Sequence, residues 1–197
     1  MNGAIIPDPK LGLPLETERG SYAILLTILT EAFLFIVLFA SYFMLGNNKD
    51  RWRIDRPPQL SLALIMLGVL LVSSLVIYWG EKQLQQGRYK NARVALGITV
   101  LIGLVFMVLQ GFEYHDHWKH LTPFTDSYGS IFYTITSFHA AHLIVGILML
   151  IYILFLRRYE PVDRAPYRPY HVGALYWHFV DIVWIFVVAI LYLGPRL

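Results

Sequence analysis

Five long apolar segments constrain the fold of this 197-residue chain more than any other feature. Each has about 20 mainly apolar residues, the length that an α-helix needs to cross the hydrocarbon core of a bilayer. The segments lie at about 22–45, 60–79, 94–112, 130–156 and 172–193. They are too long and continuous for barrel strands, and a backbone in lipid must satisfy its own hydrogen bonds, so helices are predicted. The predicted fold class is all-α: an integral membrane bundle of five transmembrane helices at residues 22–197, preceded by a polar tail at residues 1–21.

The composition agrees with a membrane protein and excludes several classes of function. Hydrophobic residues make up 57% of the chain and charged residues 15%, which is too apolar for a soluble domain of this size. The absence of cysteine excludes disulfides and thiolate metal sites. The net charge of +3 is spread over loops, which favours contact with anionic lipid head groups and predicts no nucleic-acid partner.

Lysine and arginine are divided unequally between the two sides of the predicted bundle. The tail and the second and fourth loops, which share one side, carry more of them than the first and third loops and the C-terminus. Cytoplasmic loops are enriched in these residues. The distribution therefore predicts a cytoplasmic N-terminus and a C-terminus outside.

Glu31 is an acid deep within the first apolar segment. It lies about ten residues from the start of that segment, roughly 13–15 Å into a hydrocarbon core about 30 Å thick. A carboxyl group at this depth is expected to be protonated or hydrogen-bonded, since a bare charge in hydrocarbon is costly. Two interpretations stay open: proton handling or a polar anchor for a partner subunit or lipid, and a neutral acid that only packs against a neighbouring helix.

Gln110 and Glu113 end the third segment and are followed by histidines at 115, 117 and 120. Histidines at such spacing suggest a metal site. The stretch is expected at the water interface, however, where solvated polar side chains are ordinary. We therefore favour a solvated surface over a metal site here.

Two pairs of polar residues lie in the last two segments. His139 and His142 are three residues apart, as are His178 and Asp181, so each pair is expected to share a helix face. Imidazole is a common metal ligand, but two histidines alone are a weak signature. We favour a hydrogen-bonded polar seam in which these four residues join the last two helices.

Three stretches of sequence, in this order, carry a family resemblance. In the first, Glu31 precedes the phenylalanine-rich run that ends at Tyr42-Phe43. The second joins residues 109–114 to the stretch 138–146, in which Ala140 stands where the family usually has glycine. The third is the aromatic stretch 176–184 around His178 and Asp181. Together they resemble subunit III of the haem-copper terminal oxidases, over nearly all of residues 22–193.

The resemblance implies a specific role. The five apolar segments match the five-helix bacterial form, whereas the mitochondrial form has seven helices, and this implies a bacterial plasma membrane. Subunit III of this family carries no catalytic or metal-binding residue, because haem and copper belong to subunits I and II. It packs against subunit I, binds phospholipid and supports proton uptake and sustained turnover in an enzyme that reduces oxygen to water and pumps protons. The implied site residues are Glu31, as a buried acid associated with protons or lipid, and an intramembrane polar seam of Gln110, Glu113, His139, His142, His178 and Asp181.

Four functions are compatible with the sequence. The leading one is subunit III of a cytochrome c oxidase, which Glu31 favours. The same role in a quinol oxidase, and an accessory membrane protein of a nitric oxide reductase, are the alternatives. A membrane metalloenzyme of the histidine-box type is the fourth, and we rank it last because such enzymes resemble one another in about eight clustered histidines, whereas this chain has seven in all.

Overall fold

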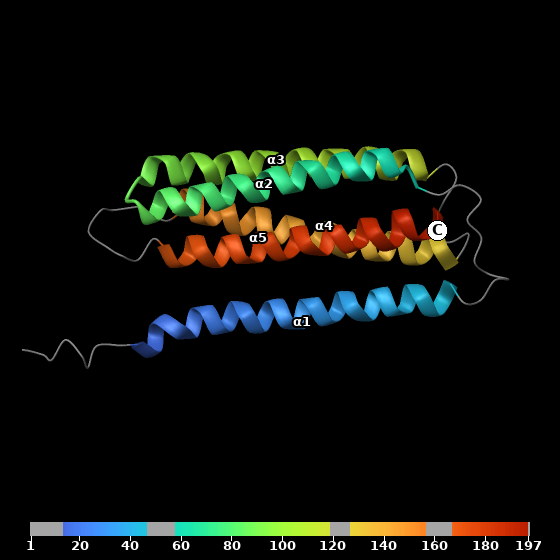
Figure 1. Cartoon of the computed structure of the whole chain (residues 1–197), viewed down its shortest axis with the longest axis horizontal. Helices are drawn as coiled ribbons and strands as arrows, with labels where there is room; N and C mark the ends of the chain where they lie inside the picture. The colour runs from blue at the N-terminus through green and yellow to red at the C-terminus, as the bar shows by residue number, and fades with distance from the viewer. Residues whose placement is uncertain (1–13, 47–57, 119–126, 157–166, 197) are drawn as a thin grey trace, which may run out of the picture.

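The structure, a computed structural model, describes residues 14–46, 58–118, 127–156 and 167–196 (Figure 1). Residues 1–13 of the predicted tail, His120 and the arginines of the first loop lie outside these ranges. The described part consists almost entirely of helices. They are α1 (Pro14–Gly46), α2 (Leu60–Gln85), α3 (Tyr89–His117), α4 (Ser127–Leu156), α5 (Tyr167–Val187), the π-helix η1 (Val188–Leu193) and the 3₁₀-helix η2 (Gly194–Arg196).

Each of the five long helices contains a stretch that is long and apolar enough to cross a membrane. The stretches are Tyr22–Gly46, Leu60–Gln85, Tyr89–His117, Ser127–Phe155 and Pro169–Arg196. The predicted fold class, an all-α bundle of five transmembrane helices, is confirmed. The helices extend beyond the predicted apolar segments because a helix does not end where its apolar run ends, but continues into the polar interface until a turn stops it. Gly87, which has a φ of 75°, makes such a turn between α2 and α3.

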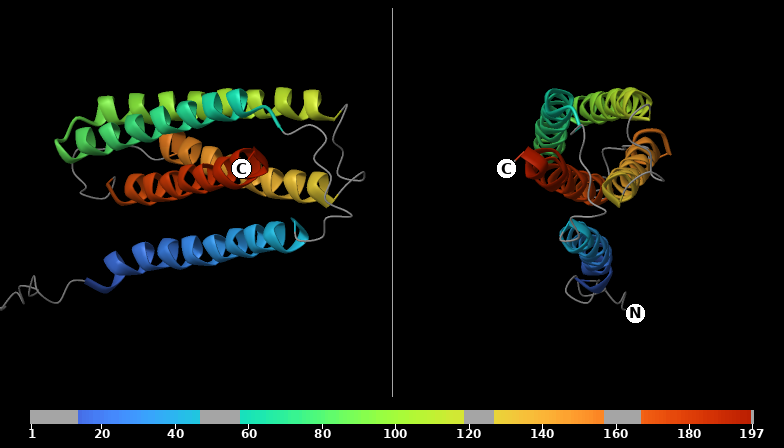
Figure 2. Two further views of the ribbon diagram at one scale, coloured as in Figure 1. Left: turned by 45° about the vertical axis from the view of Figure 1, so that its right-hand side comes forward. Right: turned by 90° about the vertical axis from the view of Figure 1, so that its right-hand side faces the viewer.

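The helices are not arranged symmetrically. Helices α2, α3, α4 and α5 form one group, and α1 lies outside it against α4 and α5, as both views of Figure 2 show. Burial follows the same division: 61% of the most apolar window of the α5 stretch is buried, but only 6% of that of α1. Helix α5 is therefore the central packing element of the described chain, whereas α1 depends on few contacts.

Glycines allow the neighbours of α5 to approach a fully buried indole. A Cβ atom on Gly103 of α3 would lie 2.7 Å from Cη2 of Trp177, and one on Gly146 of α4 would lie 3.2 Å from Cε3 of the same ring. Trp177 has no exposed surface. The small residues thus let two helices close around a large α5 side chain, as is usual where helices pack within a membrane.

Gly103→Ala is expected to destabilise the bundle by about 1–3 kcal/mol, because the added methyl group overpacks the contact with Trp177. Gly97→Ala on the same helix is the matched control, since a Cβ at that position meets nothing within 4 Å. Thermal unfolding of the purified protein in one detergent would compare the two variants. Equal melting temperatures for the two variants would contradict the close approach of α3 to Trp177.

The C-terminal end of α5 changes helix type. The π-helix Val188–Leu193 follows α5 without a break, and Tyr128 of α4 donates a hydrogen bond to the carbonyl oxygen of Leu191 at 2.9 Å. A π-turn forms its hydrogen bonds five residues apart, so it shifts the rotation of the side chains beyond it. This shift helps to set the direction of Tyr192, which contributes to the site below.

Candidate functional site

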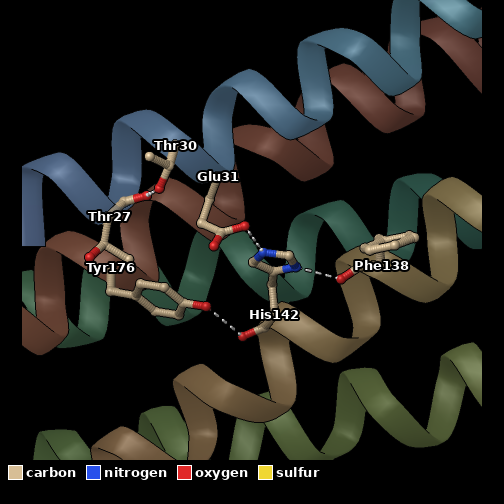
Figure 3. Close-up of polar contacts among 6 residues, drawn as sticks. All are labelled: Thr27, Thr30, Glu31, Phe138, His142 and Tyr176. Atoms are coloured by element: carbon tan, nitrogen blue, oxygen red, sulfur yellow. Dashed lines mark hydrogen bonds and ion pairs between the residues drawn. The ribbon is translucent and has the colours of Figure 1, made fainter.

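A carboxyl–imidazole pair joins α1 to α4. Oε2 of Glu31 lies 2.9 Å from Nε2 of His142, and the exposed fractions of the two side chains are 32% and 13% (Figure 3). The neighbouring Thr27 and Thr30 make hydrogen bonds to the backbone of α1 instead. Tyr176 of α5 donates to the backbone oxygen of His142 at 3.4 Å, so three helices meet at this point. Glu31 is thus a contact between helices and is not simply immersed in lipid.

The hydrogen bonds define how this pair holds its proton. Nδ1 of His142 lies 2.6 Å from the carbonyl oxygen of Phe138, which can only accept, so Nδ1 carries a hydrogen. The contact between Nε2 and Glu31 then needs one further proton, on the nitrogen or on the carboxyl group. In both cases the pair has no net charge. Such a pair can reside in a low-dielectric environment without the cost of an isolated ion.

His178 and Asp181 bond to α2, not to α4. The hydroxyl group of Ser74 lies 2.9 Å from Nδ1 of His178 and donates a hydrogen bond to Oδ2 of Asp181. At the preceding residue of each helix, Nε1 of Trp177 donates to the hydroxyl oxygen of Ser73 at 2.8 Å. Two adjacent serines in the middle of α2 thus form hydrogen bonds with three polar side chains of α5.

The interface between α2 and α5 continues toward the C-terminal end of α2. Tyr170 donates to the backbone oxygen of Ile77 at 3.1 Å, and Nδ1 of His171 lies 2.6 Å from Oε1 of Glu81. Ser73, Ser74 and Glu81 were missed by the sequence analysis. A Ser-Ser pair within an apolar segment is the signal that would have found the serines, since hydroxyl groups in membrane helices often bond across helices. Glu81 lay beyond the predicted apolar segment, although α2 extends through it.

Gln110 and Glu113 form a third polar group with the end of the chain. Glu113 has no exposed surface; Tyr192 donates to its Oε1 at 2.7 Å, and Nε2 of Gln110 donates to its Oε2 at 3.1 Å. His117 bonds to the backbone oxygen of Glu113, and His115 is exposed to solvent. Gln110 and Glu113 are therefore both interior, and Tyr192 at the π-helical end of the chain lies against Glu113.

The structure divides the predicted seam. Hydrogen bonds place His142 with Glu31 on α1, and they place His178 and Asp181 with α2. These three residues therefore do not form the predicted seam between the last two helices. The reason is rotational: residues three apart on a helix differ by about 60° around its axis. Helix α4 packs against several helices, so His142 faces α1, while His139 faces inward between Phe106 and Trp184.

The described residues bring together no group of three or more His, Cys, Asp or Glu side chains that could hold a metal ion. That the chain holds no haem, copper or other metal stays a prediction, as do the roles assigned to the site residues. What the observed groups can do chemically is hold protons between neighbouring acids, imidazoles and hydroxyls, and join helices within the membrane.

We expect a lipid-soluble carbodiimide, which reacts with protonated carboxyl groups, to label Glu31 before the other acids. Its carboxyl group shares a proton with His142, and its side chain is partly exposed between α1 and α4, so the reagent can reach it. Peptide mapping after a short reaction in the membrane measures the order of labelling. The variant Glu31→Gln is the control and should remove the early label. Labelling confined to Glu81, Glu113 or Glu160 would contradict the expected state of Glu31.

Comparisons with known proteins identify a family to which this chain is similar. The family model described as cytochrome c oxidase subunit III matches residues 17–195. A cytochrome c oxidase subunit 3 from Oryctolagus cuniculus is 33% identical over 190 residues, which cover 91% of this chain and 71% of the relative. A protein from Rickettsia bellii named "Probable cytochrome c oxidase subunit 3" is 35% identical, with coverage of 85% and 66%. A cytochrome c oxidase subunit 3 from Synechocystis is 29% identical, with coverage of 98% and 83%.

Proposed function

We propose that this chain, which belongs to the cytochrome c oxidase subunit III family, supports the assembly and sustained turnover of an oxidase whose redox centres lie in other subunits. As a member of that family it is a multi-pass membrane protein and a subunit of a haem-copper oxidase complex. The observation that carries the proposal is how its polar groups are used. Glu31 and His142, and Ser74 with its α5 partners, bond to one another between helices, as in a packing subunit.

The proposed partners are oxidase subunits I and II, with haem and copper held there, and phospholipids. The outer side of α1 supports contact with lipid or with a partner subunit, because many of its large apolar side chains are exposed. They include Leu25, Leu26, Leu29, Phe33, Ile36 and Val37. The pair of Glu31 and His142 lies behind this surface and supports a role in proton uptake, since its shared proton can reside on either side chain.

We further propose cytochrome c as the electron donor of the complex and the plasma membrane of a bacterium as its location, with the N-terminus in the cytoplasm. The names of the relatives support the donor, and the relatives from Rickettsia bellii and Synechocystis support the location. The distribution of lysine and arginine supports the orientation. Subunit III of a quinol oxidase is the alternative.

The variant His142→Leu tests the supporting role. It leaves the partly exposed Glu31 without its partner, at a cost of at most about 1–3 kcal/mol for an unsatisfied group, and should loosen α1. With reduced cytochrome c as donor, we expect oxygen consumption by the purified complex to begin at the wild-type rate and then to decay several-fold faster. Oxidation of a quinol at an equal or higher rate would instead favour the quinol oxidase.

The double variant Glu31→Leu/His142→Leu separates packing from proton handling. Replacing both partners with apolar groups is close to neutral for packing. If the pair acts by holding α1 in place, oxygen consumption by the double variant should therefore last longer than that by His142→Leu. Equally fast decay of both variants would indicate that the shared proton itself is needed. If oxygen consumption by His142→Leu lasts as long as that by the wild type, the pair does not support turnover.

A further inference from the structure

Buried polar atoms of five side chains have no hydrogen-bonding partner among the described residues, and the hydroxyl of Tyr133 and Oδ1 of Asp181 are two of these atoms. The other atoms belong to three side chains, one each from α3, α4 and α5. They are Oε1 of Gln110, both ring nitrogens of His139 and Nε1 of Trp184. His139 and Trp184 are 0% exposed and Gln110 is 2% exposed, so neither lipid nor a partner subunit can reach these atoms. Native interiors pair nearly all such atoms, because an unmet donor or acceptor in a low-dielectric interior keeps its full desolvation cost.

The three side chains lie in one part of the interior. The ring centroids of His139 and Trp184 are 4.8 Å apart, and Phe106 of α3 lies edge-on to both, at 5.8 Å and 4.9 Å. Gln110 follows Phe106 by one turn of α3, a rise of about 6 Å. It donates to Glu113, which also accepts from Tyr192, and the ring centroid of Tyr192 is 6.3 Å from that of Trp184. One or two small polar molecules, with hydrogen bonds of about 2.8 Å, can bridge polar atoms that do not touch one another directly.

The mixture of donors and acceptors selects the ligand. The indole N–H of Trp184 can only donate, and Oε1 of Gln110 can only accept. A neutral His139 offers one donor and one acceptor. A cation would require converging oxygen acceptors and an anion would require converging donors, and neither set is present in these three side chains. A water molecule, with two hydrogens and two lone pairs, matches the mixed set.

We propose that Gln110, His139 and Trp184 bind internal water between α3, α4 and α5. The water accepts from Nε1 of Trp184 and donates to His139 or to Oε1 of Gln110. Buried waters typically make about three hydrogen bonds to groups that are otherwise unsatisfied. Nε2 of Gln110 already donates to Glu113, so this water continues the polar group around Glu113 to α4. The proposal does not depend on the proposed function.

The test is an experimental structure of the assembled complex that contains this chain, at a resolution that shows ordered water. We expect water density within about 2.7–3.2 Å of Nε1 of Trp184 and of at least one of the His139 and Gln110 atoms. An interior with these side chains in place and no such density would overturn the proposal. This result needs no variant, so it does not depend on whether any substitution folds.

Two tryptophans of α5 provide a matched pair of variants. Trp177 and Trp184 are both fully buried, but Nε1 of Trp177 donates to Ser73, whereas Nε1 of Trp184 has no partner among the described residues. Trp184→Phe should abolish the water density, and Trp177→Phe should leave it in place. Unchanged water in Trp184→Phe, or its loss in Trp177→Phe with α5 in its original position, would overturn the assignment of this site to Trp184.

Discussion

Removing this chain from the oxidase is expected to leave the initial rate of oxygen reduction largely intact and to shorten the active life of the enzyme several-fold. We assign the haem and copper ligands to the partner subunits, so the redox centres should survive the loss of this chain. The packed bundle, in contrast, is proposed to exclude solvent and to order lipid around polar groups of its neighbours. Without the bundle, proton supply should slow and the subunit–lipid boundary should loosen during turnover.

Oxygen consumption over many turnovers, with and without this chain in the same lipid, measures this effect. Haem absorption spectra recorded before and after turnover serve as the control for intact redox centres. Adding the purified chain back should restore persistence. An immediate fall of activity to zero together with altered haem spectra would mean that this chain contributes to the active site itself.

Asp181→Ala is expected to lower the yield of assembled complex. Asp181 is 3% exposed, and its Oδ2 accepts the hydroxyl hydrogen of Ser74 on α2. Alanine removes this acceptor from an interface that joins the central helix to its neighbour and leaves a small cavity. Loss of a buried hydrogen-bonding partner costs about 1–3 kcal/mol. For a chain of this length, each 1 kcal/mol lowers the melting temperature by about 2–4 °C.

Two further variants serve as controls for Asp181→Ala. Asp181→Asn keeps an oxygen that can accept from Ser74, so assembly should largely recover. Ile182→Ala changes the next residue, whose side chain is 52% exposed, and should assemble like the wild type. Quantitative purification of the complex and its melting temperature are the measurements. Full assembly of Asp181→Ala with loss of activity would indicate a chemical role in place of a structural one.

The fold class was predictable because it depends on local properties of the sequence. A run of about 20 apolar residues requires a spanning helix wherever it occurs, since the backbone can satisfy itself in lipid in few other ways. All five predicted segments lie within helices that are long and apolar enough to cross a membrane. That Glu31, His142, His178 and Asp181 would find polar partners was also predictable, because polar residues inside apolar segments need partners.

The identity of those partners was decided only by the tertiary structure. Spacing along one helix places His139 and His142 near the same face, but the arrangement of neighbouring helices directs His142 to Glu31 and His139 into the interior. Ser74 is a partner only because α2 lies against α5, and Tyr192 reaches Glu113 after the π-helical turns at the end of the chain. Sequence periodicity determines which residues share a helix face, whereas helix packing and rotation determine what that face meets.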